Sequence, residues 1–330
     1  MKSVRFEAPG DIGVVDEHSR DPGEGEVAVR IDRIGICATD LHMMHGTFPT
    51  ARYPVTPGHE ATGVVAEIGA GVQSLTAGTR VILDPGLPCH DCRQCRRGTF
   101  NLCTRRRAFG VTEDGAATEQ LVVPAQNLYA VSSEVPAGAA VLGEPLACVI
   151  HAFDLVPSPA AGSVLVYGAG TVGLLAAVVA RRLGAADVSI IDLNTTRLDR
   201  AQEIGVDAAQ TAADRLAEER FDIVVDATGA APAISDGLGR VGRGGSFLQI
   251  GVARPDALVS ISPYELFARE MRVAGSMTTR FSFPPAVAML EEGAIPHHLI
   301  TGTPFSLDQY AEALAAAERG DQPKVTVGSA

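Results

Sequence analysis

A glycine-rich stretch in the middle of the chain, Ser163-Val-Leu-Val-Tyr-Gly-Ala-Gly-Thr-Val-Gly173, predicts the fold of its second half. Its β-branched and aromatic residues predict a strand, and the apolar residues that follow predict a helix. Between them, Gly168 permits a tight turn, Gly170 lets a pyrophosphate approach the backbone and the free N–H groups of the helix start, and Gly173 lets the helix pack closely. A glycine-rich turn that binds nothing is the alternative, but it leaves the joint occurrence of these elements unexplained. The residues that we assign to this dinucleotide turn are Gly168, Gly170, Thr171, Val172 and Gly173.

An acidic residue after the next predicted strand indicates which dinucleotide binds. Asp192 follows the strand Asp187–Ile191 and lies nineteen residues after Gly173. A carboxylate in this place accepts hydrogen bonds from the adenosine ribose hydroxyls and repels a 2′-phosphate. We therefore expect NAD rather than NADP as the cofactor.

Strands and helices alternate along the second half of the chain. Such alternation is typical of the α/β class, in which helices cover both faces of a doubly wound parallel sheet. Residues 1 to about 145 instead contain short strands separated by Pro and Gly turns, which predicts a β-barrel-like domain. The further expected strands are Phe221–Asp226 and Ser246–Ile250, and the expected helices are Val172–Leu183, Thr195–Ile204, Pro284–Glu292 and Leu307–Arg319.

Length and composition limit the kind of protein. A chain of 330 residues exceeds what one hydrophobic core usually serves, so we expect two domains. A formal net charge of −12 disfavours nucleic acid and anionic membranes as partners and favours a small ligand. The first residues lack the apolar run of a secretory signal, so we expect a cytoplasmic protein. In that compartment its six cysteines are expected to be metal ligands or buried thiols rather than disulfides.

Four cysteines lie within fifteen residues, in a segment over residues 88–104 that we expect to form a zinc lobe. Four thiolates at this spacing can close a tetrahedral zinc site without leaving a position for a substrate, so the site should be structural. Arginines between the ligands would offset the negative charge. Unrelated surface cysteines and a zinc-ribbon nucleic-acid module are the alternatives, and the acidic chain disfavours the second. The ligands are Cys89, Cys92, Cys95 and Cys103, and the arginines are Arg93, Arg96 and Arg97.

A second group of potential ligands is dispersed along the first 145 residues. Cys37 lies in Gly35-Ile-Cys-Ala-Thr-Asp40, His59 and Glu60 follow a Pro-Gly pair, and Glu144 begins Glu-Pro-Leu-Ala-Cys-Val. One thiolate, one imidazole and carboxylates are the mixed ligands typical of a catalytic zinc that keeps an open position. A buried cysteine and a core histidine are the alternatives when these segments are considered in isolation.

Together these motifs resemble the zinc-containing medium-chain dehydrogenase/reductase superfamily over nearly the whole chain. Cys-x-Thr-Asp, Pro-Gly-His-Glu, the four-cysteine lobe and Gly-x-Gly-x-x-Gly occur in the family's order. The resemblance implies a Rossmann NAD-binding domain over residues 146–277 and a GroES-like catalytic domain over residues 1–145 and 278–330. It also implies a homodimer or homotetramer. Glu144, in place of a cysteine, is similar to the polyol, or sorbitol dehydrogenase-like, branch.

The resemblance assigns roles around the catalytic zinc. Cys37 and His59 match zinc ligands, while Glu60 and Glu144 match ligands or hydrogen-bond partners of a bound water. Asp40 matches an outer group that supports His59 through the second imidazole N–H.

Further roles concern the proton and the cofactor. Thr39 and His42 match a relay in which the hydroxyl takes the alcohol's proton and passes it through the nicotinamide ribose to the imidazole. Arg197 matches an arginine that assists adenosine binding, and Gly251 is also assigned to the cofactor site. A solvated helix charge is the alternative for Arg197.

The chain departs from sorbitol dehydrogenases at positions expected in the substrate pocket. Met43 replaces an aromatic residue, Thr278-Thr279 replaces an Arg-Tyr pair, and Ala38 replaces a glycine. Linear sorbitol is therefore disfavoured. We expect an enzyme with two zinc ions per subunit that oxidises a secondary alcohol of a polyol, cyclitol or aminocyclitol to the ketone.

Other functions are compatible with the same motifs. Within the family, the alternatives are a simple secondary-alcohol, vicinal-diol or threonine-type dehydrogenase and a reductase without catalytic zinc. From another class, a non-catalytic NAD- and zinc-binding regulator would bind NAD without turning over any alcohol. An intact proton relay disfavours the regulator.

Overall fold

The structure is a computed structural model that describes residues 1–211, 220–320 and 322–328. The chain divides into two compact units, the first formed by Met1–Glu144 with Thr279–Ala330 and the second by Pro145–Thr278. The expected domain ranges include residues 212–219, 321 and 329–330, which lie outside the described residues. In the part of the chain that is described, no helix combines the length and apolar character needed to cross a bilayer.

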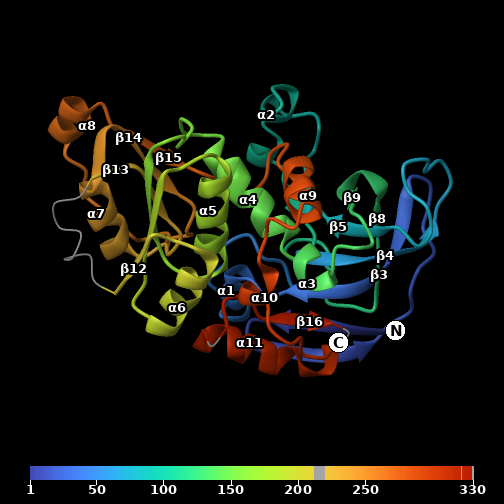
Figure 1. Ribbon diagram of the computed structural model, residues 1–330. Helices are drawn as coiled ribbons and strands as arrows, with labels where there is room; N and C mark the ends of the chain where they lie inside the picture. The colour runs from blue at the N-terminus through green and yellow to red at the C-terminus, as the bar shows by residue number, and fades with distance from the viewer. Residues whose placement is uncertain (212–219, 321, 329–330) are drawn as a thin grey trace. The chain divides into compact units, whose positions relative to one another are not determined.

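The second unit contains a parallel sheet with the strand order β12-β11-β10-β13-β14-β15 (Figure 1). The order reverses beside β10, and ligands of open parallel sheets bind at the carboxyl ends of strands at such a reversal. This topology confirms the predicted doubly wound sheet. Its strands are β10 (Ser163–Tyr167), β11 (Asp187–Ile191), β12 (Ala208–Gln210), β13 (Phe221–Asp226), β14 (Val241–Gln249) and β15 (Arg272–Gly275), and its helices include α5 (Thr171–Arg182), α6 (Thr195–Ile204), α7 (Ala231–Gly239) and α8 (Pro263–Arg269).

Local sequence signals explain why α6 begins and ends where it was predicted. The side chain of Asn194 accepts a hydrogen bond from the Arg197 backbone N–H and so caps the start of the helix. Gly205 follows the last helical residue with a φ of +93°, a conformation that glycine adopts without steric cost. Both signals are local, so the sequence alone is enough to place this helix.

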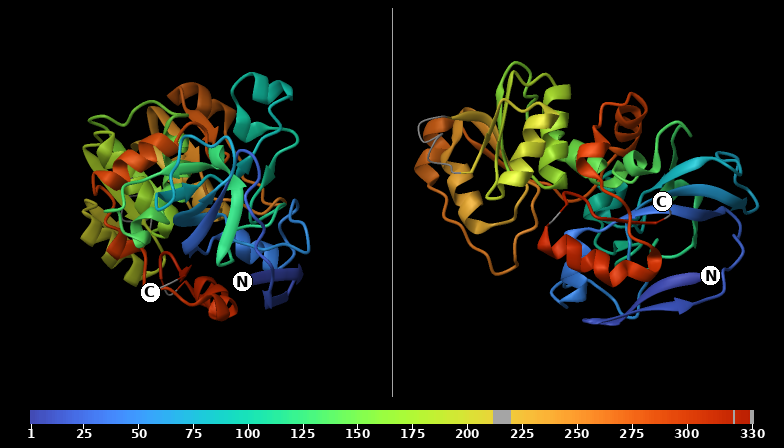
Figure 2. Two further views of the ribbon diagram at one scale, coloured as in Figure 1. Left: turned by 90° about the vertical axis from the view of Figure 1, so that its right-hand side faces the viewer. Right: turned by 60° about the horizontal axis from the view of Figure 1, so that its bottom comes forward.

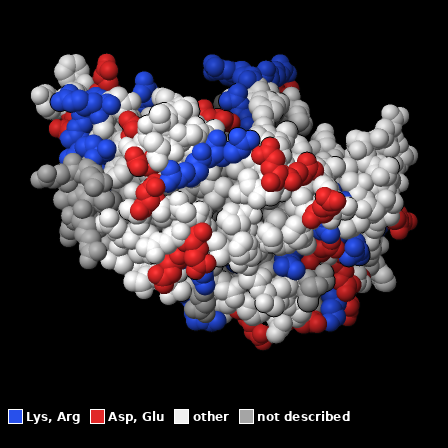
Figure 3. Space-filling view, viewed as in Figure 1, with Lys and Arg blue, Asp and Glu red and all other residues white. Residues whose placement is uncertain are grey.

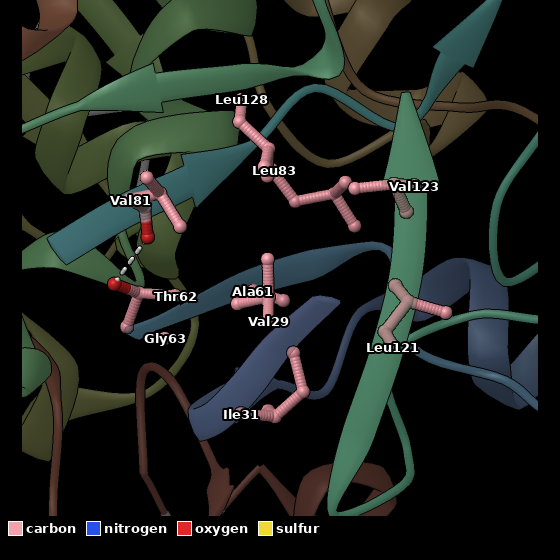
Figure 4. Close-up of a pocket in the computed structure, with 10 residues that line it drawn as sticks. All are labelled: Val29, Ile31, Ala61, Thr62, Gly63, Val81, Leu83, Leu121, Val123 and Leu128. Carbon is pink, nitrogen blue, oxygen red and sulfur yellow. Dashed lines mark hydrogen bonds between the residues drawn. The ribbon is translucent and has the colours of Figure 1, made fainter. Parts of the chain in front are cut away.

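The first unit is built on an antiparallel sheet with the order β16-β3-β4-β5-β9, and β8 also pairs with β3. Figure 4 shows apolar side chains of these strands, such as Leu83, Val123 and Leu128, pointing toward one another in the barrel interior. The Thr62 hydroxyl donates to the Val81 carbonyl at 2.8 Å, so this buried polar group is satisfied. The strands are β1 (Lys2–Ala8), β2 (Asp11–Asp16), β3 (Glu26–Gly35), β4 (Glu60–Ile68), β5 (Arg80–Leu83), β6 (Gly86–Leu87), β7 (Arg107–Ala108), β8 (Gln120–Pro124), β9 (Leu128–Ala130) and β16 (Thr326–Gly328).

The end of the chain returns to its beginning within the first unit. β16 pairs antiparallel with β3, which places Thr326 opposite Gly35. The C-terminal helix α11 lies beside the N-terminal strands in both views of Figure 2. There the ring of Tyr310 packs edge-on against Phe6, with ring centroids 6.3 Å apart. The remaining helices are α1 (Ala38–Met44), α2 (Arg93–Arg96), α3 (Ala137–Ala140), α4 (Gly143–Phe153), α9 (Phe283–Glu291), α10 (His297–Ile300) and α11 (Tyr310–Arg319).

The cysteine-rich lobe is a loop between β6 and β7 that contains α2 and the short 3-10 helix Phe100–Leu102. Exposed arginines of α2 give this lobe a basic surface, seen as the blue region at the top of Figure 3. A basic lobe on a chain of net charge −12 is consistent with a local need to balance thiolates.

Two elements, β14 and α11, begin at least three residues from the predicted start. Strand β14 begins at Val241, five residues before the predicted start, because three glycines in this segment weaken its strand pattern. Leu307–Gln309 forms a 3-10 helix that precedes α11, and its capping box with Ser306 explains why the helical pattern extends that far.

Candidate metal centres and cofactor site

The sulfur atoms of the four cysteines in the lobe lie close enough together to bind a single metal ion. The Sγ atom of Cys92 lies 3.5 Å from the Sγ of Cys95 and 3.8 Å from the Sγ of Cys103. The Sγ atoms of Cys89 and Cys95 are 4.0 Å apart. A tetrahedron with Zn–S distances of about 2.3 Å has S–S edges of about 3.8 Å. The residues therefore fit a structural zinc whose four positions are all filled by the protein.

Donors around these cysteines favour the thiolate form that binds metal. Backbone N–H groups of Cys95 and Thr104 lower the pKa of the Cys92 thiol to about 5. Backbone N–H groups of Asp91 and Cys92 lower the pKa of the Cys89 thiol to about 7. Burial instead raises the pKa of Cys95 to about 12, so its thiolate depends on a bound cation.

An arginine outside the predicted three contacts a ligand sulfur. Among the described residues, Arg105 is the arginine that donates to a ligand sulfur, with its Nη2 3.4 Å from Cys89 Sγ. Arg96, one of the three predicted for this role, donates to Asp91 at 2.7 Å, and Arg105 contacts the same carboxylate at 2.8 Å.

A second set of ligand atoms is assembled from distant parts of the first unit. Cys37 caps the start of α1, just after β3 ends, and Glu60 is the first residue of β4. The register of β3 with β4 places Gly35 opposite Glu60, which draws His59 and Glu60 toward Cys37. Ligand atoms of Cys37, His59 and Glu60 all lie within 4.8 Å of one another. They are close enough to hold one ion.

Unpaired polar atoms beside these residues indicate that the set is built for a cation. Among the described residues, neither His59 Nδ1 nor Asp40 Oδ1 has a hydrogen-bond partner, although both are buried and only 3.8 Å apart. Burial would lower the pKa of His59, but the negative charges of Asp40 and Cys37 raise it well above its ordinary value. Burial raises the pKa of Asp40. The residues fit a zinc ion bound through the other imidazole nitrogen, with Nδ1–H directed at Asp40.

Glu144 lies at the edge of this centre. It is in the first turn of α4 and only 8% exposed, and its negative charge contributes to the raised pKa of His59. In the described part of the chain, the set whose ligand atoms lie within 4.8 Å does not include Glu144. This arrangement favours a role through water rather than a permanent bond to the ion.

The structure also reveals a partner of Glu60 that the sequence did not suggest. Lys324, from the C-terminal segment, contacts both carboxylate oxygens of Glu60 at 2.5 and 2.7 Å. The available signal was composition, because only two of the 27 basic residues are lysines. No spacing rule connects residues so far apart.

The residues of the expected proton relay share helix α1. Thr39 Oγ1 is 3.8 Å from Cys37 Sγ, and His42 lies three residues further along the helix, on the same side. The imidazole Nδ1 of His42 is 3.2 Å from the Thr47 hydroxyl. The expectation for the next residue was wrong. Met43 is fully buried in the barrel core, not in a substrate pocket, because its side of the helix faces inward.

The glycine turn after β10 has the features of a phosphate site. Gly168 has a φ of +99°, and a Cβ on Gly173 would lie 1.7 Å from the Gly168 carbonyl oxygen. A Cβ on Gly170 would meet no protein atom, so the space before the N-terminus of α5 is open. A tight turn, a close helix and an open helix start together fit a pyrophosphate.

Asp192 stands at the end of β11 next to this turn. Its carboxylate accepts hydrogen bonds from the backbone N–H groups of Ala169 at 2.7 Å and Asn194 at 2.8 Å. Arg197 Nη1 is 3.8 Å from it. Gly251 follows β14 at the same edge of the sheet, where a Cβ would lie 2.3 Å from the Gly229 nitrogen. Asp192 thus has a structural role in the turn, which the sequence pattern did not predict.

Two family models match the chain. The alcohol dehydrogenase GroES-like domain covers residues 23–133, and the zinc-binding dehydrogenase model covers residues 171–292. The chain is 37% identical to D-altritol 5-dehydrogenase of Agrobacterium fabrum, over 91% of each chain. The chain belongs to the zinc-containing alcohol dehydrogenase family. The present chain is also 32% identical to D-arabinitol dehydrogenase 1 of Uromyces fabae, over 95% of this chain and 93% of that one.

Solved structures agree with this assignment. A zinc-binding dehydrogenase from Sinorhizobium meliloti bound to NADP has a TM-score of 0.96 and 31% identity, and covers 99% of each chain. An alcohol dehydrogenase from Escherichia coli complexed with NADH has a TM-score of 0.92 and 28% identity, and it covers 100% of this chain and 99% of that one. The GroES-like and Rossmann fold is therefore confirmed. The protein is a zinc-dependent alcohol dehydrogenase of the polyol dehydrogenase branch and acts on CH–OH groups.

Proposed function

We propose that this dehydrogenase oxidises a secondary alcohol of a polyol, cyclitol or aminocyclitol to the ketone, reversibly and with NAD as hydride acceptor. The observation that carries the proposal is the set of Cys37, His59 and Glu60, whose ligand atoms lie within 4.8 Å of one another, with His59 and Glu60 buried. A thiolate, an imidazole and a carboxylate are the mixed ligands of catalytic rather than structural zinc. The names of two relatives contain altritol and arabinitol, and both compounds are polyols.

In this proposal Cys37, His59 and Glu60 would hold the catalytic zinc, and Asp40 orients the imidazole. When bound, the zinc ion supplies Lewis acidity at the alcohol oxygen, and the nicotinamide accepts the hydride. Thr39 Oγ1, which lies 3.8 Å from Cys37 Sγ, would accept the alcohol's proton while its own hydroxyl proton is released toward His42. His42, half-buried and next to the exposed Thr47, then moves the proton toward solvent.

The proposed NAD preference rests on Asp192. A carboxylate at the end of the second strand repels the 2′-phosphate of NADP, and the N–H groups of Ala169 and Asn194 keep this carboxylate in place. Arg197, which could contact a phosphate, lies 3.8 Å from Asp192. NADP is the specific competitor, since the Sinorhizobium meliloti structure contains it.

The range of proposed substrates is wider than the sequence implied. Met43 lies in the barrel core, so its replacement of an aromatic residue gives no reason to exclude linear polyols. Thr278-Thr279 remains a departure from sorbitol dehydrogenases, and it removes a cationic handle. Substrates without a negative charge therefore fit the proposal best, and these include polyols, cyclitols and aminocyclitols.

The test is a panel of candidate substrates in which the absorbance of the reduced nicotinamide measures turnover. Linear polyols, cyclitols, aminocyclitols, simple secondary alcohols, vicinal diols and threonine are each assayed with NAD and with NADP. We expect the highest kcat/KM for a polyhydroxylated alcohol with NAD. Higher values for threonine or a simple alcohol would contradict the substrate class, and higher values with NADP would contradict the cofactor. NAD binding with no turnover on any alcohol would favour a regulator.

We further propose a homo-oligomer formed through the edge of the parallel sheet. Among the described strands, β15 is at the edge, and Val273 on it is 48% exposed. On the adjacent helix α8, Tyr264 and Phe267 are 71% and 81% exposed. An apolar sheet edge of this kind is normally covered by another chain. Light scattering should give a dimer or tetramer, and Phe267→Glu should lower its mass. A wild-type monomer would contradict the proposal.

A further inference from the structure

Asp226 is a buried carboxylate at the carboxyl end of β13, and the proposed chemistry does not use it. The strand register places it between Tyr167 at the end of β10 and Gln249 at the end of β14. The strand order of the sheet reverses beside β10, where ligands of open parallel sheets bind. Asp226 is fully buried, and no described residue forms an ion pair with it. A buried charge without a counter-ion is costly unless polar groups stabilise it.

Four hydrogen bonds stabilise the Asp226 carboxylate. The Thr228 hydroxyl donates to Oδ1 at 2.6 Å, and the backbone N–H of Thr228 donates to the same oxygen at 3.2 Å. The Gly229 N–H and the Gln249 Nε2 donate to Oδ2 at 2.9 and 2.6 Å. Gln249 Nε2 also donates to the Gly251 carbonyl at 2.5 Å. One carboxylate therefore ties the turn after β13 to the turn after β14.

Two glycines let these two turns approach each other backbone to backbone. A Cβ on Gly251 would lie 2.3 Å from the Gly229 nitrogen, and a Cβ on Gly229 would lie 2.3 Å from the Val252 carbonyl oxygen. Gly229 also has a φ of +69°, a conformation that favours glycine. A side chain at either position would push the turns apart. The glycines and the Asp226 carboxylate thus hold the turns in one arrangement.

The tied turns lie beside the glycine turn that has the features of a phosphate site. A Cβ on Gly168 would lie 3.0 Å from Thr228 Cγ2, so Thr228 is close to the first glycine of that turn. The Ala227 N–H donates to the Tyr167 carbonyl at 2.9 Å, which joins the turn after β13 to the end of β10. A Cβ on Gly170 would meet no protein atom. The tied turns therefore lie next to the open space before α5.

We propose that Asp226 and Gln249 are positioning residues for NAD, which hold the turns after β13 and β14 as one wall of the dinucleotide site before the cofactor binds. This inference rests on the proposed use of NAD. A wall that is already ordered reduces the entropy lost on binding. The proposal also explains the buried charge. A carboxylate accepts all four hydrogen bonds, whereas the amide of an asparagine would direct two N–H donors at other donors.

The experiment compares Gln249→Met with Gln120→Met. Gln249→Met removes the hydrogen bonds to Asp226 and Gly251 but keeps the side-chain length and the buried charge. Its Kd for NAD, measured by calorimetry, should rise about 10-fold, because a hydrogen bond to a charged group is lost. The KM for NAD should rise with it, while the KM for the alcohol changes less than about two-fold. Gln120, whose amide donates to Ser19 in the first unit, is the control. Gln120→Met should match the wild type in all three measurements.

A double variant tests whether Gln249 acts through the carboxylate. In an Asp226→Asn background, Gln249→Met should raise the Kd for NAD by a smaller factor than it does in the wild type. If Asp226→Asn does not fold, Gly251→Ala makes the test with both side chains intact, because its Cβ separates the turns. The Kd of Gly251→Ala for NAD should then rise at least as much as that of Gln249→Met.

Three results would overturn the proposal. They are a wild-type Kd for NAD in Gln249→Met, an equal rise of both KM values with a lower melting temperature, and full additivity of Asp226→Asn with Gln249→Met. If Gly251→Ala replaces the double variant, a wild-type Kd in Gly251→Ala would overturn it. Failure of the proposed function is distinct, since the wild-type protein would then itself not bind NAD.

Discussion

The four-cysteine lobe takes its ligands from fifteen consecutive residues, whereas the Cys37 centre takes them from the ends of β3 and β4, with Lys324 supplied from the far end of the chain. In the lobe, four sulfur atoms lie within 4.8 Å of one another, and Arg105 contacts one of them from the surface. In the Cys37 centre, buried atoms such as His59 Nδ1 are left without a partner among the described residues.

This difference separates a centre that stabilises from one that reacts. A closed set of thiolates offers a substrate no position, so its free energy of metal binding can only support folding. A mixed set with buried carboxylates and unpaired atoms is costly to fold and is retained for chemistry. The following predictions test that division of roles.

The largest effect is expected from changing a ligand of the Cys37 centre. Cys37→Ser and His59→Ala should each lower kcat by at least about 100-fold, because a ligand of the catalytic metal is lost. Affinity for NAD, measured by fluorescence titration, should stay close to that of the wild type. Turnover equal to the wild type in either variant would remove the basis for the assignment.

The next effect concerns the lobe. Cys95→Ser should lower the free energy of unfolding by at least about 2 kcal/mol and remove one zinc per chain, because structural zinc contributes folding energy. Denaturant unfolding and metal analysis measure both quantities. The remaining folded enzyme should keep kcat near the wild-type value. Normal stability and metal content would contradict a structural role.

A smaller and more selective effect is expected at Asp40. Asp40→Asn removes the carboxylate that faces His59, so zinc affinity at the Cys37 centre should fall about 10- to 100-fold. Competition with a chelator, followed by metal analysis, should show one zinc leaving earlier than in the wild type. Equal loss from both centres would show that Asp40 does not act on His59 alone.

The smallest effect is expected at Arg105. Its side chain is 61% exposed and contacts Asp91 and Cys89 at the surface of the lobe. Arg105→Gln should therefore cost less than about 1 kcal/mol of stability, with zinc content and kcat unchanged. A loss as large as that of Cys95→Ser would mean that charge balance is as important to the lobe as its ligands.

Features determined by nearby residues could be predicted from the sequence. The helix Thr195–Ile204 has its cap and its terminating glycine beside it, and the four cysteines have metal spacing within one loop. The strand Asp187–Ile191 is a short apolar run bounded by acidic residues. Local patterns of this kind survive folding because tertiary contacts reinforce them.

Features determined by long-range pairing could not be predicted. The contact of Lys324 with Glu60 joins residues 264 positions apart and depends on β16 pairing with β3. The burial of Met43 depends on which side of α1 faces the barrel, and seven residues of helix do not settle that. Arg105 folds back onto Cys89 only because the lobe has closed.

The central claim is that one chain holds two zinc ions, of which only the one at Cys37 is catalytic. The most direct test measures zinc per chain and polyol oxidation on the same samples of wild type and Cys37→Ser. The account predicts two zinc ions and activity in the wild type, and one zinc ion, a normal fold and no activity in the variant. One zinc ion in the wild type, or a variant that keeps both its zinc and its activity, would contradict it.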